Sequence, residues 1–121
     1  MPIADVEIVL RPGEVLRPEM AAELANELGE IFQSSPRGTW VRVRCLPADH
    51  YAENSGRPAE VYPIFVSILK AILPVAHEID MEVARITGAV AQICGRPSEN
   101  VHVIYQPEAR GRVAFGGKIV S

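Results

Sequence analysis

The chain has 121 residues, of which 48% are hydrophobic and 22% are charged, and its formal net charge is -3. These values are typical of a single globular domain that is large enough to bury an apolar core. The net negative charge gives no electrostatic reason to expect nucleic acid or an anionic membrane as a partner. Apolar runs stay well below the roughly 18 residues of a membrane span, and no basic, apolar leader opens the sequence. We therefore expect a cytoplasmic protein.

The first half of the chain has the pattern of a β-α-β unit. Apolar and polar residues alternate from Ile3 to Leu10, which predicts a strand ended by the turn residues 11–13. Apolar residues at helical spacing predict a helix from Pro18 to Phe32. Alternation returns from Trp40 to Leu46 and predicts a second strand. A helical crossover of this length makes the two strands parallel.

The second half repeats this order after a polar loop over residues 47–59. Tyr62 to Leu69 is a nearly continuous apolar run and predicts the third strand. Helical spacing predicts a second helix from about Ile79 to Cys94, with Asp80 as its N-cap. Val101 to Tyr105 predicts the fourth strand. Two short apolar segments, 113–115 and 118–120, flank Gly116-Gly117 and predict a terminal hairpin.

The two halves also resemble each other in sequence. Pro2-Ile3 opens the first strand and Pro63-Ile64 opens the third, and Val41-Arg42-Val43 corresponds to Val101-His102-Val103. We expect an α/β (α+β) fold in which duplicated β-α-β units form a four-stranded mixed sheet with two helices on one face, plus a short C-terminal hairpin. Two helices cannot cover both faces of the apolar third strand, so we expect an oligomer that buries the second face. The single domain would span residues 1–121, with repeats at about 2–60 and 61–121.

The N-terminal dipeptide Met1-Pro2 carries a possible chemistry. If Met1 is removed, Pro2 becomes a secondary amine, and an α-amino group titrates at about 7.7–8.0. A free amine that titrates near neutral pH is a competent general base. Many chains begin with Met-Pro, so the dipeptide alone assigns no function. A retained Met1 would turn the Pro2 nitrogen into a tertiary amide, which is no base.

Taken together, these features resemble the tautomerase superfamily, which includes 4-oxalocrotonate tautomerase and macrophage migration inhibitory factor. The resemblance covers the whole chain. It is carried by Pro2, the doubled β-α-β order, Val41-Arg42-Val43, the segment 46–49, and the glycine-rich ending 112–118. It implies a homotrimer with sites near the subunit interfaces and Pro2 as general base, without metal or organic cofactor. The implied activity is keto-enol tautomerisation of small 2-oxo or 2-hydroxy-enoic acids or phenylpyruvate-like enols.

Cations are the first candidates for binding a carboxylate substrate, because arginine offers a fixed fork of hydrogen-bond donors. Arg42 matches the strand arginine of 4-oxalocrotonate tautomerase, and Arg44 lies two residues further on the same face. Arg11 follows the first strand roughly where that family has another functional arginine, and Arg17 competes for this role. Lys70 ends the third strand, where relatives with decarboxylase or dehalogenase activity carry arginines. Each of these cations could instead be a solvated surface residue.

Two further residues are candidates through the resemblance. Phe115 matches the hairpin aromatic that forms an apolar wall near the proline, and it could equally be a core residue. His102 aligns with a site tyrosine of migration inhibitory factor, although a lone strand histidine is usually structural. His50 and His77 sit alone in the sequence, so no spacing suggests a metal site. Cys45 and Cys94 lie within apolar patterns and are expected to be small buried thiols.

Departures from the family pattern limit the chemistry. The lysine that migration inhibitory factor uses has no match in residues 35–38, and the water-handling aspartate of malonate semialdehyde decarboxylase is absent near Gly38. The helix histidine of cis-3-chloroacrylic acid dehalogenase has no match in residues 25–32. A decarboxylase or hydratase is therefore disfavoured. A non-catalytic trimeric scaffold remains open, and so does a dimeric ferredoxin-like module, which the apolar third strand and Gly-Gly hairpin disfavour.

Overall fold

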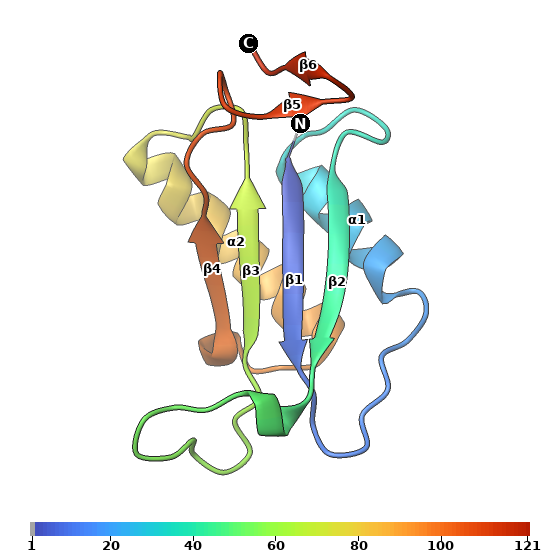
Figure 1. The fold of residues 1–121 in the computed structure, drawn as a ribbon, viewed down its shortest axis with the longest axis vertical. Helices are drawn as coiled ribbons and strands as arrows, with labels where there is room; N and C mark the ends of the chain where they lie inside the picture. The colour runs from blue at the N-terminus through green and yellow to red at the C-terminus, as the bar shows by residue number, and fades with distance from the viewer. Residues whose placement is uncertain (1) are drawn as a thin grey trace.

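A computed structural model describes residues 2–121, which form one four-stranded sheet, two helices and a small hairpin (Figure 1). Two short 3-10 turns lie at Ala48–His50 and Ser98–Asn100. The elements are β1 (Ile3–Val9), α1 (Met20–Ile31), β2 (Trp40–Leu46), β3 (Ile64–Leu69), α2 (Ala76–Cys94), β4 (Val101–Tyr105), β5 (Ala114–Phe115) and β6 (Lys118–Ile119).

The sheet has the order β2-β1-β3-β4. β1 pairs in parallel with β2, β3 pairs in parallel with β4, and the two β-α-β units meet at the antiparallel pair of β1 and β3. Both helices lie behind the same face of the sheet, and the β5–β6 hairpin lies beyond the end where β1 begins (Figure 1). The predicted fold class, a mixed four-stranded sheet with two helices on one face and a terminal hairpin, is confirmed.

The core lies between this sheet face and the helices. Alternate residues of β1 and β3 are buried there, as period-two alternation requires. The apolar stripes of α1 and α2 pack onto these strand residues, so burial of apolar surface holds the helices to the sheet. The buried residues of this core include Ala4, Val6, Ile8, Ile64, Val66 and Ile68 from the sheet and Leu24, Leu28, Ile86 and Val90 from the helices.

The opposite face of the sheet, called the open face below, has no helix over it (Figure 1). It carries charged residues such as Asp5 and Arg42 beside apolar ones. Trp40 and Ile104 on this face are 42% and 51% exposed. An uncovered apolar sheet surface of this kind is typical of proteins that associate.

Two prolines occupy corresponding places in the two units. Pro2 precedes β1 and Pro63 precedes β3, and both are buried. The Pro2 carbonyl accepts a hydrogen bond from the Trp40 amide at 3.0 Å, and the Pro63 carbonyl accepts one from the Val9 amide at 3.1 Å. Each proline is thus held by a neighbouring strand.

A buried arginine ties the far end of the sheet together. The Arg96 side chain is 1% exposed and makes a two-point contact with the Glu14 carboxylate, at 2.7 and 3.0 Å. It also donates to the carbonyls of Tyr62 and Val9 at 2.9 Å each. These bonds join the end of β1, the approach to β3 and the segment after α2. The Arg96 guanidinium lowers the pKa of Glu14 below its ordinary value.

The structure corrects three sequence predictions. Helix α2 begins at Ala76, so Asp80 lies inside the helix and the predicted N-cap is wrong; extended Val75 takes that position. β3 begins at Ile64, two residues later than predicted. Cys94 is buried, and burial raises the pKa of its thiol to about 11. Cys45 is exposed, because β2 is an edge strand and ends beyond the cover of the helices.

Among residues 2–121, no helix is both long and apolar enough to cross a membrane.

Candidate active site

A hollow opens beside Pro2, at the end of the sheet where β1 begins and β3 ends. Because β1 and β3 are antiparallel, Ile3 lies opposite Leu69, which brings Pro2 and Lys70 to one place. The hollow has a volume of about 420 Å³ and is called the Pro2 hollow below. Its lining comes from three segments and comprises Pro2, Phe32, Gln33, Ser34, Ser35, Gly38, Lys70, Ala71 and Ile72.

Pro2 is held in place through Trp40. The Trp40 amide donates to the Pro2 carbonyl, and the Trp40 indole donates to the Arg37 carbonyl at 3.0 Å. The ring of Phe115 packs edge-on against Trp40, with the ring centroids 5.3 Å apart. Phe115 therefore contacts Trp40, which holds Pro2, and Phe115 is not among the residues that line the hollow. Met1, and with it the question of its removal, lies outside the described residues.

Lys70 brings a positive charge to the Pro2 hollow. Its ammonium lies 2.8 Å from a carboxylate oxygen of Glu82 and 4.9 Å from the centre of the Phe32 ring. The other carboxylate oxygen of Glu82 accepts a hydrogen bond from the Tyr105 hydroxyl at 2.5 Å. Lys70 is the one titratable side chain among the residues that line this hollow. A bound carboxylate or a developing enolate would find its charge partner there.

The loop between α1 and β2 forms another wall of the hollow. A Cβ atom at Gly38 would lie only 2.9 Å from the Ser35 carbonyl oxygen and 3.2 Å from its hydroxyl. The hydroxyls of Ser34 and Thr39 share a hydrogen bond of 2.5 Å within the same loop. The close approach at Gly38 gives a physical reason why no longer side chain stands at this position of the loop.

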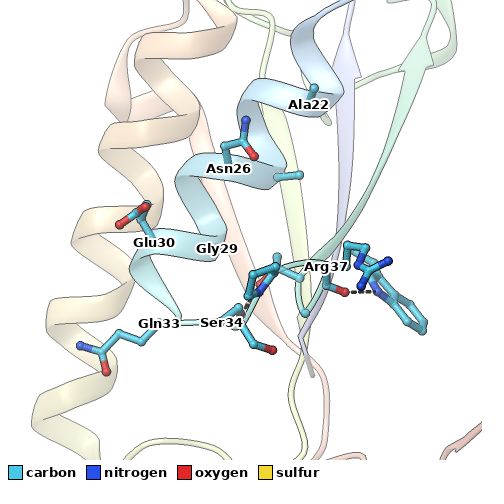
Figure 2. A pocket seen from close by; sticks show the side chains of 13 residues that line it. Ala22, Asn26, Gly29, Glu30, Gln33, Ser34 and Arg37 are labelled. Carbon is cyan, nitrogen blue, oxygen red and sulfur yellow. Dashed lines mark hydrogen bonds between the residues drawn. The ribbon is translucent and has the colours of Figure 1, made fainter.

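A larger groove runs along α1 and into the same loop. Its volume is about 920 Å³, and it shares Gln33, Ser34, Ser35 and Gly38 with the Pro2 hollow. Figure 2 shows Asn26 and Glu30 following one another along α1 beside this groove. Its wall is built mainly of small and polar side chains without a cluster of charges. Chemistry therefore favours the smaller Pro2 hollow over the larger groove.

Arg42 lies on the open face of the sheet, away from the Pro2 hollow of its own chain. Its guanidinium makes two hydrogen bonds to the Asp5 carboxylate, at 2.6 and 2.8 Å. This bonding lowers the pKa of Asp5 below its ordinary value. The pair lines a separate hollow of about 230 Å³, together with residues such as Ser67 and Arg112. In one chain the structure does not bring Arg42 and Pro2 together.

Arg44 and His102 also lie on the open face, further from Pro2. Arg44 stands opposite Glu7, four residues along β1 from Ile3. His102 stands opposite Phe65, and the two rings lie 5.5 Å apart in a tilted arrangement. Both candidates therefore lie in one row across the sheet, separate from the Pro2 hollow.

Arg11 and Arg17 lie at the opposite end of β1 from Pro2. Arg11 donates to the Gly95 carbonyl at 2.7 Å. Arg17 forms a two-point pair with Glu23, with both distances at 2.8 Å. Within one chain, neither arginine contributes to the lining of the Pro2 hollow.

Sequence reasoning missed several residues around Pro2. Phe32 falls in the predicted first helix, and nothing in the sequence marks Gln33 or Ser34 as functional. Glu82 and Tyr105 gave no signal, because a helical glutamate and a strand tyrosine are usually structural. Of the residues in this arrangement around Pro2, Lys70 was already a candidate, because it ends the third strand. Nowhere in residues 2–121 do three or more His, Cys, Asp or Glu side chains gather as a metal site would require.

The fold defines a class of known proteins. No sequence family model and no curated protein match the chain. Solved structures match it over nearly its full length, and they are homologues of 4-oxalocrotonate tautomerase (4-OT) and macrophage migration inhibitory factor (MIF). Pt0534, inactivated by 2-oxo-3-pentynoate, has a TM-score of 0.77 at 12% identity and covers 98% of this chain and 94% of its own.

Two other structures show the range of these matches. MIF2 from Leishmania major has a TM-score of 0.70 at 17% identity, with 98% of this chain and 97% of its own covered. A symmetric trimer of the Q0 fused 4-OT has a TM-score of 0.77 at 10% identity, with 98% and 94% covered. The chain therefore has the fold of the tautomerase superfamily, as its sequence predicts. The low identities establish the fold alone.

Proposed function

We propose that the protein is a cofactor-independent keto-enol tautomerase of small 2-oxo or 2-hydroxy-enoic acids or phenylpyruvate-like enols, with Pro2 as general base. The observation that carries this proposal is the meeting of Pro2 and Lys70 in one hollow of about 420 Å³. Once Met1 is removed, the Pro2 nitrogen is a secondary amine. Its buried surroundings favour the neutral form, which is the form that accepts a proton.

The reaction needs only a base and a positive charge. The neutral Pro2 amine accepts the hydroxyl proton of the enol and leaves an enolate. The C=C electron pair of the enolate then takes a proton at carbon from the protonated amine while an oxygen electron pair closes the carbonyl bond, which restores the base. Lys70 offers its ammonium to the substrate carboxylate or to the negative charge that develops on oxygen. No electrons leave the substrate, so the proposal requires neither metal nor redox cofactor.

The proposal includes a homotrimer. Support comes from the open face of the sheet, with its exposed Trp40 and Ile104, and from the trimeric fused 4-OT that shares the fold. Arg42 lies on this open face in a pair with Asp5. In a trimer, Arg42 of one subunit would reach the Pro2 hollow of its neighbour and bind the substrate carboxylate. A single chain would then hold Pro2 and Lys70 but lack one cation of its site.

The first test joins intact mass with kinetics. A mass lacking one methionine, together with ketonisation of phenylpyruvate enol or 2-hydroxymuconate, is the expected result. Pro2→Ala should lower the rate by about 10²-fold or more, which is within the range of general-base catalysis. Pro63→Ala is the matched control, because Pro63 is buried at the start of β3 but its nitrogen is an internal amide. A retained methionine, or equal rates for Pro2→Ala and the wild type, would exclude the mechanism.

A second test labels the amine directly. 2-Oxo-3-pentynoate has an electron-poor triple bond to which a neutral amine adds without a leaving group. The expected product carries one adduct on the N-terminal peptide, and Pro63→Ala should label like the wild type. Turnover with release of carbon dioxide would point instead to a decarboxylase, and addition of water to the substrate would point to a hydratase. A chain that neither labels nor turns over would be a scaffold with this fold.

A further inference from the structure

Lys70 belongs to a three-residue network that connects the Pro2 hollow to α2 and β4. Lys70 follows the last residue of β3, Glu82 lies on α2, and Tyr105 ends β4. All three side chains lie on the face of the sheet that the helices cover. The Glu82 and Lys70 side chains are only 12% and 18% exposed. The network is therefore built into the protein rather than formed on its surface.

Both oxygens of the Glu82 carboxylate have a partner in this network. One accepts from the Lys70 ammonium at 2.8 Å, and the other accepts from the Tyr105 hydroxyl at 2.5 Å. Burial and the neighbouring carboxylate raise the pKa of Tyr105 above its ordinary value, so this hydroxyl remains a donor. The Glu82 carboxylate is consequently held in one orientation.

Lys70 stands at the junction of two hollows. The Pro2 hollow and an adjoining hollow of about 530 Å³ share Phe32, Gln33, Lys70 and Ile72. Among the described residues, the Lys70 ammonium has one hydrogen-bond acceptor, Glu82. An ammonium carries three donors, so two remain for a ligand. The Phe32 ring limits the positions of the ammonium by lying 4.9 Å from it.

A structural ion pair alone does not explain this arrangement. A pair buried to this degree contributes little net stability compared with apolar residues of the same size, since both charges lose their hydration. Holding the long lysine side chain removes its rotamer freedom before a ligand arrives, so less entropy is lost on binding. What the network supplies is a fixed position of the ammonium where the two hollows meet.

We propose that Glu82, fixed by Tyr105, is a positioning residue that holds Lys70 for the carboxylate of the substrate and sets the charge felt by the Pro2 amine. This inference rests on the proposed function, because it assigns Lys70 to substrate binding. The negative charge of Glu82 partly cancels the effect of the positive Lys70 charge on the Pro2 amine. Other charged groups near Lys70 are Glu78 and Arg85, which lie on α2 and line the adjoining hollow, and Glu108, whose carboxylate accepts from the Leu73 amide.

The test measures how the pH dependence moves in two opposite variants. Glu82→Gln leaves the Lys70 charge unbalanced, which disfavours a protonated Pro2 amine. The acid limb of the rate profile should then move to lower pH, and KM should rise several-fold while kcat changes less. Lys70→Met leaves the Glu82 charge instead, so the limb should move to higher pH. The double variant should return the limb close to its wild-type position, at a raised KM.

Control variants separate positioning from stability. Tyr105→Phe keeps the ion pair but frees one Glu82 oxygen. It should raise KM and shift the acid limb by less than Glu82→Gln does. This variant also keeps the proposal testable if the Glu82 variant fails to fold. Asp80→Asn removes an exposed carboxylate from the same helix that lines neither hollow, and it should change neither KM nor the limb. Shifts in the same direction for Glu82→Gln and Lys70→Met, or KM values within twofold of the wild type, would overturn the proposal.

A further measurement distinguishes failure of the positioning role from failure of the proposed function. The rate of labelling by 2-oxo-3-pentynoate, measured against pH, reports the free amine without any turnover and should show the same opposite shifts. If Pro2→Ala abolishes activity while Glu82→Gln leaves KM and both pH profiles unchanged, only the positioning role is wrong. If the N-terminal peptide does not label, the general base is wrong, and the positioning role falls with it.

Discussion

Arg42 and Asp5 stand opposite each other on the parallel strands β2 and β1, and two hydrogen bonds of 2.6 and 2.8 Å join them. The pair lies on the open face of the sheet, whereas Pro2 lines a hollow beside the end of α1. One chain therefore keeps its strand arginine apart from its own proline. A role for Arg42 in the proposed reaction requires a second copy of the chain.

Replacement of Arg42 tests this requirement. Arg42→Ala should lower kcat/KM for a carboxylate substrate by about tenfold or more, because a charge-assisted contact to the substrate is lost. Arg17→Ala is the control, since Arg17 forms a similar exposed two-point pair with Glu23 far from Pro2. Equal, small effects of both variants would show that Arg42 acts only as a surface ion pair. The measurement is steady-state kinetics at a protein concentration that keeps the oligomer intact.

The contact between Glu14 and Arg96 should make stability depend on pH. The pKa of Glu14 in the folded protein lies below its ordinary value of 4.5. The contribution is therefore complete above that value and is lost as the pH falls through the lower, folded pKa. Glu14→Gln should reduce the free energy of unfolding at about pH 7 by about 3 kcal/mol, the lower end of the range for breaking a buried pair.

Urea unfolding at several pH values checks this prediction. The difference between Glu14→Gln and the wild type should shrink as the pH falls below 4.5 and the wild-type carboxylate becomes protonated. Glu23→Gln serves as control, since its carboxylate pairs with Arg17 at an exposed site. A difference that does not change with pH would mean that Glu14 acts through packing rather than charge.

The end of α2 offers a test of backbone conformation. Gly95 has a φ of +67° at the position that follows the helix, and side chains rarely adopt this conformation. Gly95→Ala should lower the free energy of unfolding by about 1 kcal/mol. Gly88→Ala, in the exposed interior of the same helix with open space around its Cβ, should raise it by about 0.5–1 kcal/mol. Thermal unfolding distinguishes the two variants by the sign of the change.

Gly38 allows the wall of the Pro2 hollow to be moved by one methyl group. In Gly38→Ala the new Cβ would lie 2.9 Å from the Ser35 carbonyl oxygen, so the loop must shift. We expect kcat/KM to fall by about tenfold, because small displacements in a site have large kinetic effects. In Gly29→Ala the new Cβ would lie 4.0 Å from Thr39, an ordinary contact, and activity should be retained. Full activity in Gly38→Ala would separate this loop from the reaction.

The sequence predicted most of the fold because its patterns are local. Alternation along β2 and β4 matched both strands residue for residue, and Gly95 marked the end of α2. The start of α2 was wrong because the apolar spacing first becomes clear at Ile79, whereas the helix begins right after Val75. Such starts depend on backbone geometry before the helix rather than on the helical pattern.

The candidate site was less accessible to sequence reasoning. Lys70 could be named through the resemblance alone, which places a cation at the end of the third strand. Glu82 and Tyr105 could not, since their meeting depends on how α2 crosses the sheet. In the proposed trimer, the position of Arg42 relative to Pro2 would depend on contacts between chains, which no periodicity within one chain encodes.

The paired prolines that open β1 and β3 have a consequence for stoichiometry. Pro2 and Pro63 each precede a strand of the sheet and are buried, and each carbonyl accepts a hydrogen bond from a neighbouring strand, from Trp40 of β2 and from Val9 of β1. Joining two β-α-β units in one polypeptide turns the second proline into an amide, so two units share one potential amine. Under the proposed function, the second half of the chain therefore contributes no general base of its own. A circular permutant beginning at Pro63 would exchange the two roles within one unchanged fold.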